Sequence, residues 1–420
     1  MLFNEARARA LLQEMGVDAV VAAAPLSVDY LTDHRSSFET TFRRYHMVPG
    51  GGPELLFRSF ALATAAGERT LIAHAATVAT APPAWTGGIE VYGGGGFEPA
   101  EAEGVPEEFR GMARLLARRS ADVGPLEAVA AAIARAVPHG GRVAVEAAGL
   151  AAGELDALRA LLPGHELGDG SVLLRLVRMV KTADEIARSR RAAEIAEGAL
   201  HAMVAAAAPG RTLAELAQVF RCEVAAGGAD LEHVAIDPFG LGIATVSSYA
   251  VQERDVLLLD VGCLYRSCVS DTGVTLALEP LAGEAAERYD LVRTCLEAGA
   301  ALLGPGVRVS AVYAAMRAVV DGTLAQRSAP QGHGLGLEPR ELPFIGPPTE
   351  LRLADDIVDL EVDQALEPGM VINLEVPLEW PGHYAVHVER SFLIGAGGVE
   401  PLLVQDRSSA LPAGRERISE

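Results

Sequence analysis

The sequence contains few cysteines and few basic residues, and both shortages exclude classes of protein. Its 420 residues include four cysteines, Cys222, Cys263, Cys268 and Cys295, and no two of them are spaced as a C-x-x-C pair. We therefore expect no disulfide framework and a reducing compartment. Lys and Arg total 35 against 56 Asp and Glu, and the resulting net charge of −21 disfavours a nucleic-acid partner.

The sequence also lacks a recognisable targeting or membrane-spanning segment. Residues Met1–Arg7 do not combine a basic region with a following apolar run, as a secretory signal does. The longest apolar stretches are rich in alanine and interrupted, so they are too short to span a bilayer. We therefore predict a cytoplasmic protein that does not act at a membrane.

Length and pattern together predict two domains. Half of the residues are hydrophobic, which is enough for a sizeable core. Strands alternate with helices over residues 1–172, and this alternation predicts an α/β domain. The strands are expected at 18–23, 69–74, 89–92 and 142–146, and the helices near 107–118, 124–137 and 153–161.

The second predicted domain covers residues 173–405, and residues 406–420 are expected to be a C-terminal tail. The domain should open with an apolar strand at 173–180. Thr182 with Glu185, and Thr212 with Glu215, have the spacing of capping boxes, in which each side chain satisfies an orphan amide. Two long helices are therefore predicted after residues 182 and 212.

Four carboxylates and one imidazole stand out in the second domain. They are Asp260, Asp271, His333, Glu375 and Glu389; the four acids lie on two predicted strands and a predicted hairpin, and His333 lies in a glycine-rich turn. Burying a bare carboxylate among apolar strand residues would cost several kcal/mol unless the carboxylate were paired or bound to a metal. This ligand set suits a pair of divalent ions, because carboxylates bridge metals and an imidazole suits borderline ones.

Several segments resemble a known family of metallopeptidases. They are Asp260–Gly262, Ser270–Thr275, Gly332–Glu338, Glu375 and Glu389. The set is similar to the motifs of the pita-bread metallopeptidase family, which includes Xaa-Pro dipeptidases, aminopeptidase P, methionine aminopeptidase and creatinase. The resemblance extends over nearly the whole chain through the segments Ser27–Thr32, Leu176–Ile186 and Pro209–Thr212.

The resemblance implies a fold, a quaternary state and a metal site. The fold would be a creatinase-like α/β N-terminal domain followed by an α+β pita-bread catalytic domain, in a homodimer. Asp260 and Asp271 would hold one divalent ion, His333 and Glu375 the other, and Asp271 and Glu389 would bridge the two ions, which would be Mn, Co, Zn or Fe. A metal-bridged water would attack a peptide or amide carbonyl while Glu375 shuttles its proton.

The chain departs from the family pattern where a histidine should lie upstream of Asp260. The corresponding stretch, Ile243–Tyr249, contains no histidine. Ser247, Ser248 or Tyr249 would have to act there as a neutral hydrogen-bond donor. We take Tyr249 as a candidate substrate-binding residue.

A second family histidine, expected seven residues after His333, is replaced by Arg340. Arginine stays charged and cannot donate a proton to a leaving group near neutral pH. Two roles remain open for Arg340. It would either clamp a substrate carboxylate with two hydrogen bonds, as a catalytic and substrate-binding residue, or serve as an ion-pair partner.

Three further positions are candidates around the site. His387 stands where the family has an arginine, and would either support Glu389 or act as a replacement acid in catalysis. His383 would line the rim of the substrate pocket. The pair Arg43–Arg44 is a weak candidate for binding an acidic group, because N-terminal domains reach the partner's active site in creatinase-like dimers.

Three functions remain open from the sequence. The first is a dinuclear metal-dependent hydrolase of short peptides, like an Xaa-Pro dipeptidase or aminopeptidase. The second is a non-peptidase enzyme on the same scaffold, either a creatinase-like amidinohydrolase or a lyase acting on a small carboxylate, which Arg340 favours. The third is a catalytically silent binding module, and the complete ligand set argues against it.

Overall fold

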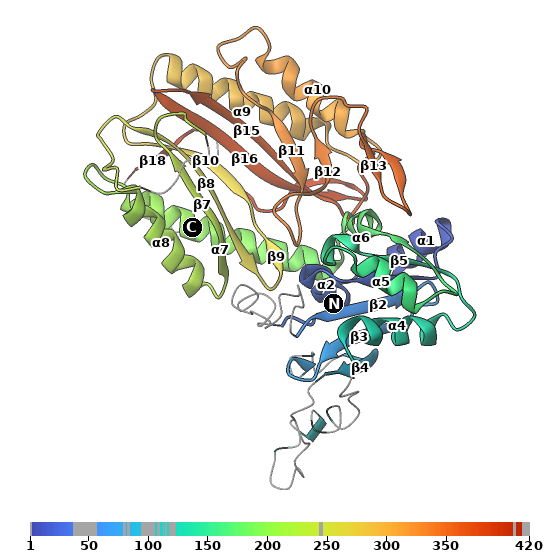
Figure 1. Cartoon of the computed structure of the whole chain (residues 1–420). Coiled ribbons are helices and arrows are strands. Elements are labelled where there is room, and N and C mark those ends of the chain that lie inside the picture. The colour runs from blue at the N-terminus through green and yellow to red at the C-terminus, as the bar shows by residue number, and fades with distance from the viewer. Residues whose placement is uncertain are drawn as a thin grey trace. The chain divides into compact units, whose positions relative to one another are not determined.

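The chain divides into two compact units (Figure 1). The first consists of Met1–Arg178 and Arg352–Leu360, and the second of Met179–Leu351 and Glu361–Glu420. The computed structural model describes residues 2–36, 57–78, 81, 85–93, 106, 110, 111, 113, 116, 123–242, 247–405 and 409–413. The sequence predicted domain boundaries at 1–172, 173–405 and 406–420. The division into two compact units does not test these boundaries, and they remain a prediction.

The first unit is built on a mixed sheet. Within the described residues, its six strands run in the order β4-β3-β2-β1-β5-β6, with β1 parallel to β5 and antiparallel to β2. Apolar, buried strand residues pack against α4 (Pro125–Ala136), whose Val129 and Ile133 are fully buried. The strands are β1 (Ala19–Ala22), β2 (Ser59–Thr64), β3 (Arg69–His74), β4 (Gly88–Tyr92), β5 (Arg142–Val145) and β6 (Glu166–Asp169). The other helices among the described residues of this unit are α1 (Glu5–Glu14), α2 (Pro25–Thr32), the 3-10 helix η3 (Ala147–Gly149), α5 (Glu154–Leu161) and α6 (Ser171–Arg178).

The strand predicted at 173–180 is wrong, because Ser171–Arg178 forms helix α6. Arg175 is its one exposed residue, so almost every side chain is buried and an apolar run of this kind does not separate strand from helix. The helix starts where two carboxylates accept its first amides. Ser171 N donates to Asp169 Oδ1 (2.9 Å), and Val172 N donates to Asp355 Oδ2 (2.8 Å).

Residues 352–360 belong to the first unit although the chain on both sides of them belongs to the second. They carry most of the hairpin formed by β13 (Arg352–Ala354) and β14 (Asp359–Glu361). Between these strands, Asp356 Oδ2 accepts a hydrogen bond from Asp169 N (2.9 Å), and its carbonyl accepts one from Arg142 Nη2 (3.1 Å). The hairpin is therefore fastened to the β5–β6 edge of the sheet.

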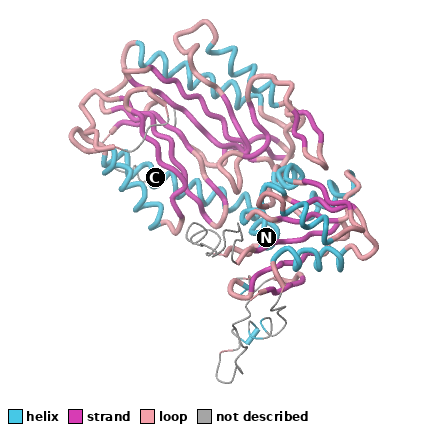
Figure 2. The backbone as a smooth tube through the Cα atoms, in the orientation of Figure 1, coloured by secondary structure: helices cyan, strands magenta, loops and turns pink. Residues whose placement is uncertain are grey.

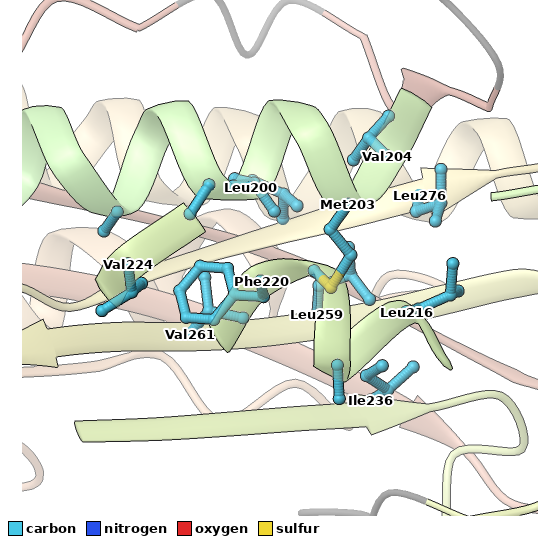
Figure 3. Close-up of a cluster of buried hydrophobic side chains, with 14 of the residues drawn as sticks. Leu200, Met203, Val204, Leu216, Phe220, Val224, Ile236, Leu259, Val261 and Leu276 are labelled. Carbon is cyan, nitrogen blue, oxygen red and sulfur yellow. The ribbon is translucent and has the colours of Figure 1, made fainter. Parts of the chain in front are cut away.

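The second unit opens with two helices that the sequence predicted. These are α7 (Ala183–Ala206) and α8 (Leu213–Ala226), and both capping boxes are present with their reciprocal hydrogen bonds. Figure 3 shows the core that the helices share with a sheet: Phe220 and Met203 lie among Leu259, Val261 and Ile236. All five side chains are buried at 0 % exposure, so this face of the sheet is sealed by apolar packing.

Two sheets of the second unit meet at β10 and β16 (Figure 2). The first has the order β18-β10-β8-β7 with β9 paired to β8, and the second has the order β12-β11-β15-β16-β17. Thr275 joins them: its Oγ1 donates to His387 O (3.0 Å) and accepts from His387 N (2.8 Å). The strands are β7 (Asp230–Asp237), β8 (Val256–Tyr265), β9 (Cys268–Val269), β10 (Thr272–Ala277), β11 (Gln331–Gly334), β12 (Glu341–Ile345), β15 (Val371–Trp380), β16 (Tyr384–Gly395), β17 (Gly398–Pro401) and β18 (Leu411–Pro412).

Two further helices cover the second sheet. Helix α9 (Glu284–Leu302) packs against β15 and β16, and α10 (Val309–Val320) packs against α9. None of the helices in the described part of the chain has the length and apolar character that crossing a membrane requires. Apolar side chains thus back both sheets, and the polar strand residues are left to face one another.

Candidate metal centre

Two aspartates reach the site from the β8–β10 hairpin. Leu259 and Val261 on β8 point into the helix-covered core, so the alternation of the strand turns Asp260 to the opposite face. Asp260 is paired in register with Gly273, and Asp271 lies just before β10. The hairpin therefore presents both carboxylates on one side.

The second sheet supplies an imidazole and two glutamates. Glu375 on β15 lies directly opposite Glu389 on β16, and His333 on β11 lies opposite Asn373. Asn373 Nδ2 donates to Glu389 Oε1 at 2.5 Å and holds that carboxylate in place. His333, Glu375 and Glu389 are buried at 1 %, 5 % and 1 % exposure, so they are withdrawn from bulk water.

The five residues selected from the sequence meet in space. His333 Nε2 lies 3.7 Å from Glu375 Oε1 and 3.8 Å from Asp271 Oδ2. One ligand atom from each of Asp271, His333 and Glu389 lies within 4.8 Å of the others. His333 Nδ1 contacts the carbonyl of Gly334 at 3.1 Å, so a proton on Nδ1 leaves the Nε2 lone pair turned towards the acids.

Burial and neighbouring negative charges disfavour the ionised form of the glutamates in this cluster. Burial raises the pKa of Glu389 well above its usual range, and the charges of the neighbouring Asp271 and Asp260 raise it further. Burial likewise raises the pKa of Glu375 to about 7, against the lowering effect of the Arg340 guanidinium. Burial lowers the pKa of His333, which keeps the imidazole neutral. Such a cluster needs cations to stay ionised.

Orphaned atoms test whether a divalent ion fits. Glu389 Oε2 and His333 Nε2 are buried and have no hydrogen-bond partner. An unpaired buried acceptor is costly, and a cation at this place would satisfy both. Carboxylate oxygens with an imidazole nitrogen are also a suitable donor set for first-row divalent ions. The residues therefore fit the group that the sequence predicted.

His233, on β7, is a site residue that the sequence analysis missed. Its Nε2 lies 2.9 Å from Asp260 Oδ1 and 3.4 Å from Asp271 Oδ1, and its Nδ1 contacts the Glu232 carboxylate. Although burial lowers the pKa of His233, hydrogen bonds to these carboxylates raise it overall. The signal would have been strand register: Ala235 pairs with Asp260, and His233 lies two residues before Ala235 on the same face. Residues 238–255 separate β7 from β8, so the sequence does not reveal this pairing.

His387 and Arg340 both face Glu375. His387 Nε2 lies 3.8 Å from Glu375 Oε2 and 3.9 Å from Glu389 Oε2, and the residue is 1 % exposed. Burial lowers the pKa of His387. Arg340 Nη2 donates to Glu375 Oε1 at 2.6 Å, while half of the Arg340 side chain remains exposed. Arg340 is therefore an ion-pair partner here, and its exposed part leaves a substrate role open.

The other predicted residues lie apart from the acids. The hydroxyl of Tyr249 donates to Asp255 Oδ2 (2.8 Å), and its ring packs against the α7–α8 core on the far face of the β8 sheet. His383 is exposed in the β15–β16 turn, about 17 Å along the strands from Glu375 at an ordinary rise per residue. Ser247 and Ser248 are described, whereas 243–246 and Arg43–Arg44 lie outside the described residues.

A family model matches this part of the chain. It is described as metallopeptidase family M24, and it matches residues 187–396, which is half of the chain. All five predicted ligands and His233 fall inside the matched range.

Curated relatives are similar over a comparable region. An Xaa-Pro dipeptidase from Lactobacillus delbrueckii subsp. lactis is 26 % identical over 267 residues, which is 61 % of this chain and 69 % of the relative. A probable dipeptidase, PepE, from Mycobacterium tuberculosis is 28 % identical over 234 residues, which is 54 % of this chain and 59 % of the relative.

Solved structures are similar over almost the whole chain. An Xaa-Pro dipeptidase from Bacillus anthracis has a TM-score of 0.72 at 19 % identity, and the match covers 96 % of this chain and 97 % of that one. A prolidase from Thermococcus sibiricus has a TM-score of 0.71 at 19 % identity, with coverages of 96 % and 97 %. The likeness confirms the predicted fold class, an α/β N-terminal domain followed by an α+β pita-bread domain.

Proposed function

Because this chain belongs to metallopeptidase family M24, we propose that it is a metal-dependent hydrolase that cleaves Xaa-Pro dipeptides. The observation that carries the proposal is the convergence of four carboxylates and His333, with the buried atoms Glu389 Oε2 and His333 Nε2 left unpaired. The names of the curated relatives support a dipeptide as the substrate.

The proposed site holds two divalent ions of the Mn, Co, Zn or Fe type. Asp260 and Asp271 would hold one ion, His333 and Glu375 the other, and Asp271 and Glu389 would be shared. When bound, such ions lower the pKa of a coordinated water and polarise a carbonyl, which is the chemistry that amide hydrolysis requires.

Residues of the chain supply the remaining functions. By the family resemblance, Glu375 would take up and return a proton, and its burial, which raises the pKa of its carboxyl, favours that role. His387 is buried between Glu375 and Glu389, and we propose that it orients these two carboxylates. The buried setting of the cluster excludes bulk water and strengthens each electrostatic contact.

The test is a substrate panel with metal-loaded protein. Protein stripped of metal and reloaded with Mn, Co or Zn should cleave dipeptides with proline in second place, and should leave matched dipeptides with alanine there largely intact. Asp271→Asn, which removes the charge of the shared ligand, should abolish cleavage and metal retention together. Protein that retains metal yet cleaves none of the Xaa-Pro dipeptides would contradict the peptidase function.

A second candidate function follows from Arg340. A permanent cation 2.6 Å from Glu375 suits recognition of a small carboxylate, which is the substrate class of the non-peptidase alternative. Arg340→Ala should raise the KM for a dipeptide with a free carboxylate by about 10- to 100-fold, as expected for loss of charged hydrogen bonds. The corresponding dipeptide amide is the control, and its KM should not change. Equal losses on both substrates would show that Arg340 acts through Glu375 alone.

Two further proposals concern the cellular compartment and the oligomeric state of the protein. We propose that it works in the cytoplasm, which its free cysteines support: Cys263, Cys268 and Cys295 are buried and Cys222 is exposed. We also propose a homodimer, on the family resemblance alone. Sedimentation analysis of the purified protein tests the second proposal.

A further inference from the structure

A second imidazole stands beside the predicted ligands, on a strand that contributes none of the five. His233 lies on β7, the edge strand of its sheet, and its side chain is 28 % exposed. We propose that His233 is a ligand of the ion held by Asp260 and Asp271, so that each of the two ion positions has one imidazole nitrogen. This inference rests on the proposed metal binding and specifies it further.

The first argument is geometric. Ligand atoms of His233, Asp260 and Asp271 all lie within 4.8 Å of one another, as do those of Asp271, His333 and Glu389. Asp271 belongs to both groups, so the two groups are adjacent and share one carboxylate. Each group then contains one histidine and at least two carboxylates, which is a complete basis for a metal position.

The second argument concerns the orientation of the ring. Nδ1 of His233 contacts the Glu232 carboxylate, and Nε2 donates a hydrogen bond to Asp260 Oδ1 (2.9 Å), whose proton an ion bound at this place would displace. Histidines that bind metals usually donate the other ring N–H to a carboxylate or a carbonyl, which fixes the tautomer and leaves one lone pair for the ion. His333 follows the same arrangement with the Gly334 carbonyl. Both imidazoles are therefore held with Nε2 presented to the acids.

The third argument is the space that the sheet leaves for this ring. Gly262 is paired with His233 across β7 and β8. A Cβ atom at Gly262 would lie 2.5 Å from Cε1 of His233 and 2.3 Å from the carbonyl of Ser270, closer than real contacts allow. The His233 ring thus occupies a place that only glycine at position 262 keeps open.

Two imidazoles change which metals the site prefers. Carboxylates alone suit Mg and Mn, whereas imidazole nitrogen favours Fe, Co, Ni and Zn. With a nitrogen at each position, we infer a preference for Zn and Co over Mn at both positions, including the one held by Asp260 and Asp271.

The experiment measures metal binding, independently of activity. Full-length protein stripped of metal is titrated with Zn²⁺ and, separately, with Mn²⁺. His233→Ala should weaken Zn²⁺ binding at one position by about 10- to 100-fold, and Mn²⁺ binding by less. His233→Gln repeats the test with a side chain closer in size. His201→Ala is the matched control, because His201 also contacts a carboxylate, that of Glu197, but on the exposed face of α7.

A spectroscopic test identifies the nitrogen directly. In His333→Ala loaded with one equivalent of Mn²⁺, pulsed electron paramagnetic resonance should still detect coupling to an imidazole nitrogen, and adding His233→Ala should remove it. Coupling that is absent from His333→Ala, or that survives in the double variant, would overturn the proposal. So would Zn²⁺ affinity in His233→Ala within twofold of wild type. Wild-type protein that binds neither metal would instead contradict the proposed function.

Discussion

Glu185 and Glu215 perform the same local task in opposite electrostatic environments. Each accepts the amide of a capping threonine at the start of a helix, Thr182 for α7 and Thr212 for α8. Burial raises the pKa of Glu185 to about 7 and outweighs its hydrogen bonds with Thr182. The amide of Thr212 lowers the pKa of the exposed Glu215. Only Glu185 therefore opposes folding when it is charged.

This contrast predicts a pH-dependent stability. The folded protein keeps the proton of Glu185 up to about pH 7, whereas an unfolded chain releases it near pH 4.5, so stability falls as pH rises through that window. Glu185→Gln removes this loss, and its stability relative to wild type should increase by about 2–3 kcal/mol between pH 5 and pH 8. Urea unfolding across this range measures the difference.

Glu215→Gln is the control for that experiment. This variant changes the same position of an equivalent capping box, but the pKa of Glu215 is lowered in the folded protein. The stability of Glu215→Gln relative to wild type should therefore not increase as pH rises. Parallel profiles for the two variants would contradict the role given to burial of Glu185.

Single residues also mark the limit of what the sequence could predict about the site. The five predicted ligands were recognisable because acids at strand ends, a histidine between glycines and characteristic segments occur together. His233 was not recognisable, because its place opposite Gly262 depends on how β7 pairs with β8, and residues 238–255 separate these strands in the sequence. The ring of Tyr249 packs against the core that α7 and α8 share with the sheet, and its predicted role in substrate binding stays a prediction.

At the scale of elements, a glycine on β10 allows the large side chains of β16 to lie close to the β8–β10 hairpin. A Cβ at Gly273 would lie 2.2 Å from Cε1 of His387 and 2.7 Å from Glu389 Oε2. His387 is fully enclosed, so its ring cannot move aside cheaply. The close approach of β10 and β16 therefore depends on the absence of a side chain at position 273.

Gly273→Ala should accordingly displace His387 and the Glu389 carboxylate. We expect a loss of about 1–3 kcal/mol in stability from overpacking, together with weaker metal binding. Thermal unfolding with and without Zn²⁺ measures both effects. Gly283→Ala serves as the control, because no atom lies near a Cβ there, although its positive φ adds some backbone strain. Unchanged metal affinity in Gly273→Ala would show that His387 is not fixed by this contact.

Elements with an explicit local signal were predictable, and those without one were not. The capping boxes determine where α7 and α8 begin, and both helices begin at the predicted residues. Helix α6 was interpreted as a strand because its apolar run is short and almost wholly buried, although Ser171, Arg175 and Arg178 recur at helical spacing. The hairpin β13–β14 belongs to the first unit through carboxylate contacts with distant amides, and local sequence cannot reveal such partners.

At the scale of the whole molecule, every proposed metal ligand lies in the second unit. The ligands come from β7, β8, β10, β11, β15 and β16 or the residue beside them, and the first unit contributes none. Ligand binding stabilises only a state that holds the ligand, by RT ln(1 + [L]/Kd). Metal should therefore stabilise the second unit selectively.

Metal removal tests this selectivity. At a Zn²⁺ concentration of about 100 times Kd, we expect the second unit to gain about 2.7 kcal/mol against opening, and the first unit to gain none directly. Hydrogen exchange followed by mass spectrometry should show slower exchange in β8 and β15 of the metal-loaded protein than of the metal-stripped protein. Exchange in β1 and β5 should be the same in both. Asp271→Asn should erase the difference. Slower exchange confined to the first unit would contradict the placement of the metals.

The hairpin at 352–360 has a consequence for folding during translation. A ribosome that adds roughly 5–20 residues per second reaches Asp355 about 10 to 35 s after Arg178. Throughout that interval the amides of Val172 and Asp169 have not yet met the carboxylates that accept them, those of Asp355 and Asp356. The first unit is thus completed only after Met179–Leu351 of the second unit has been synthesised.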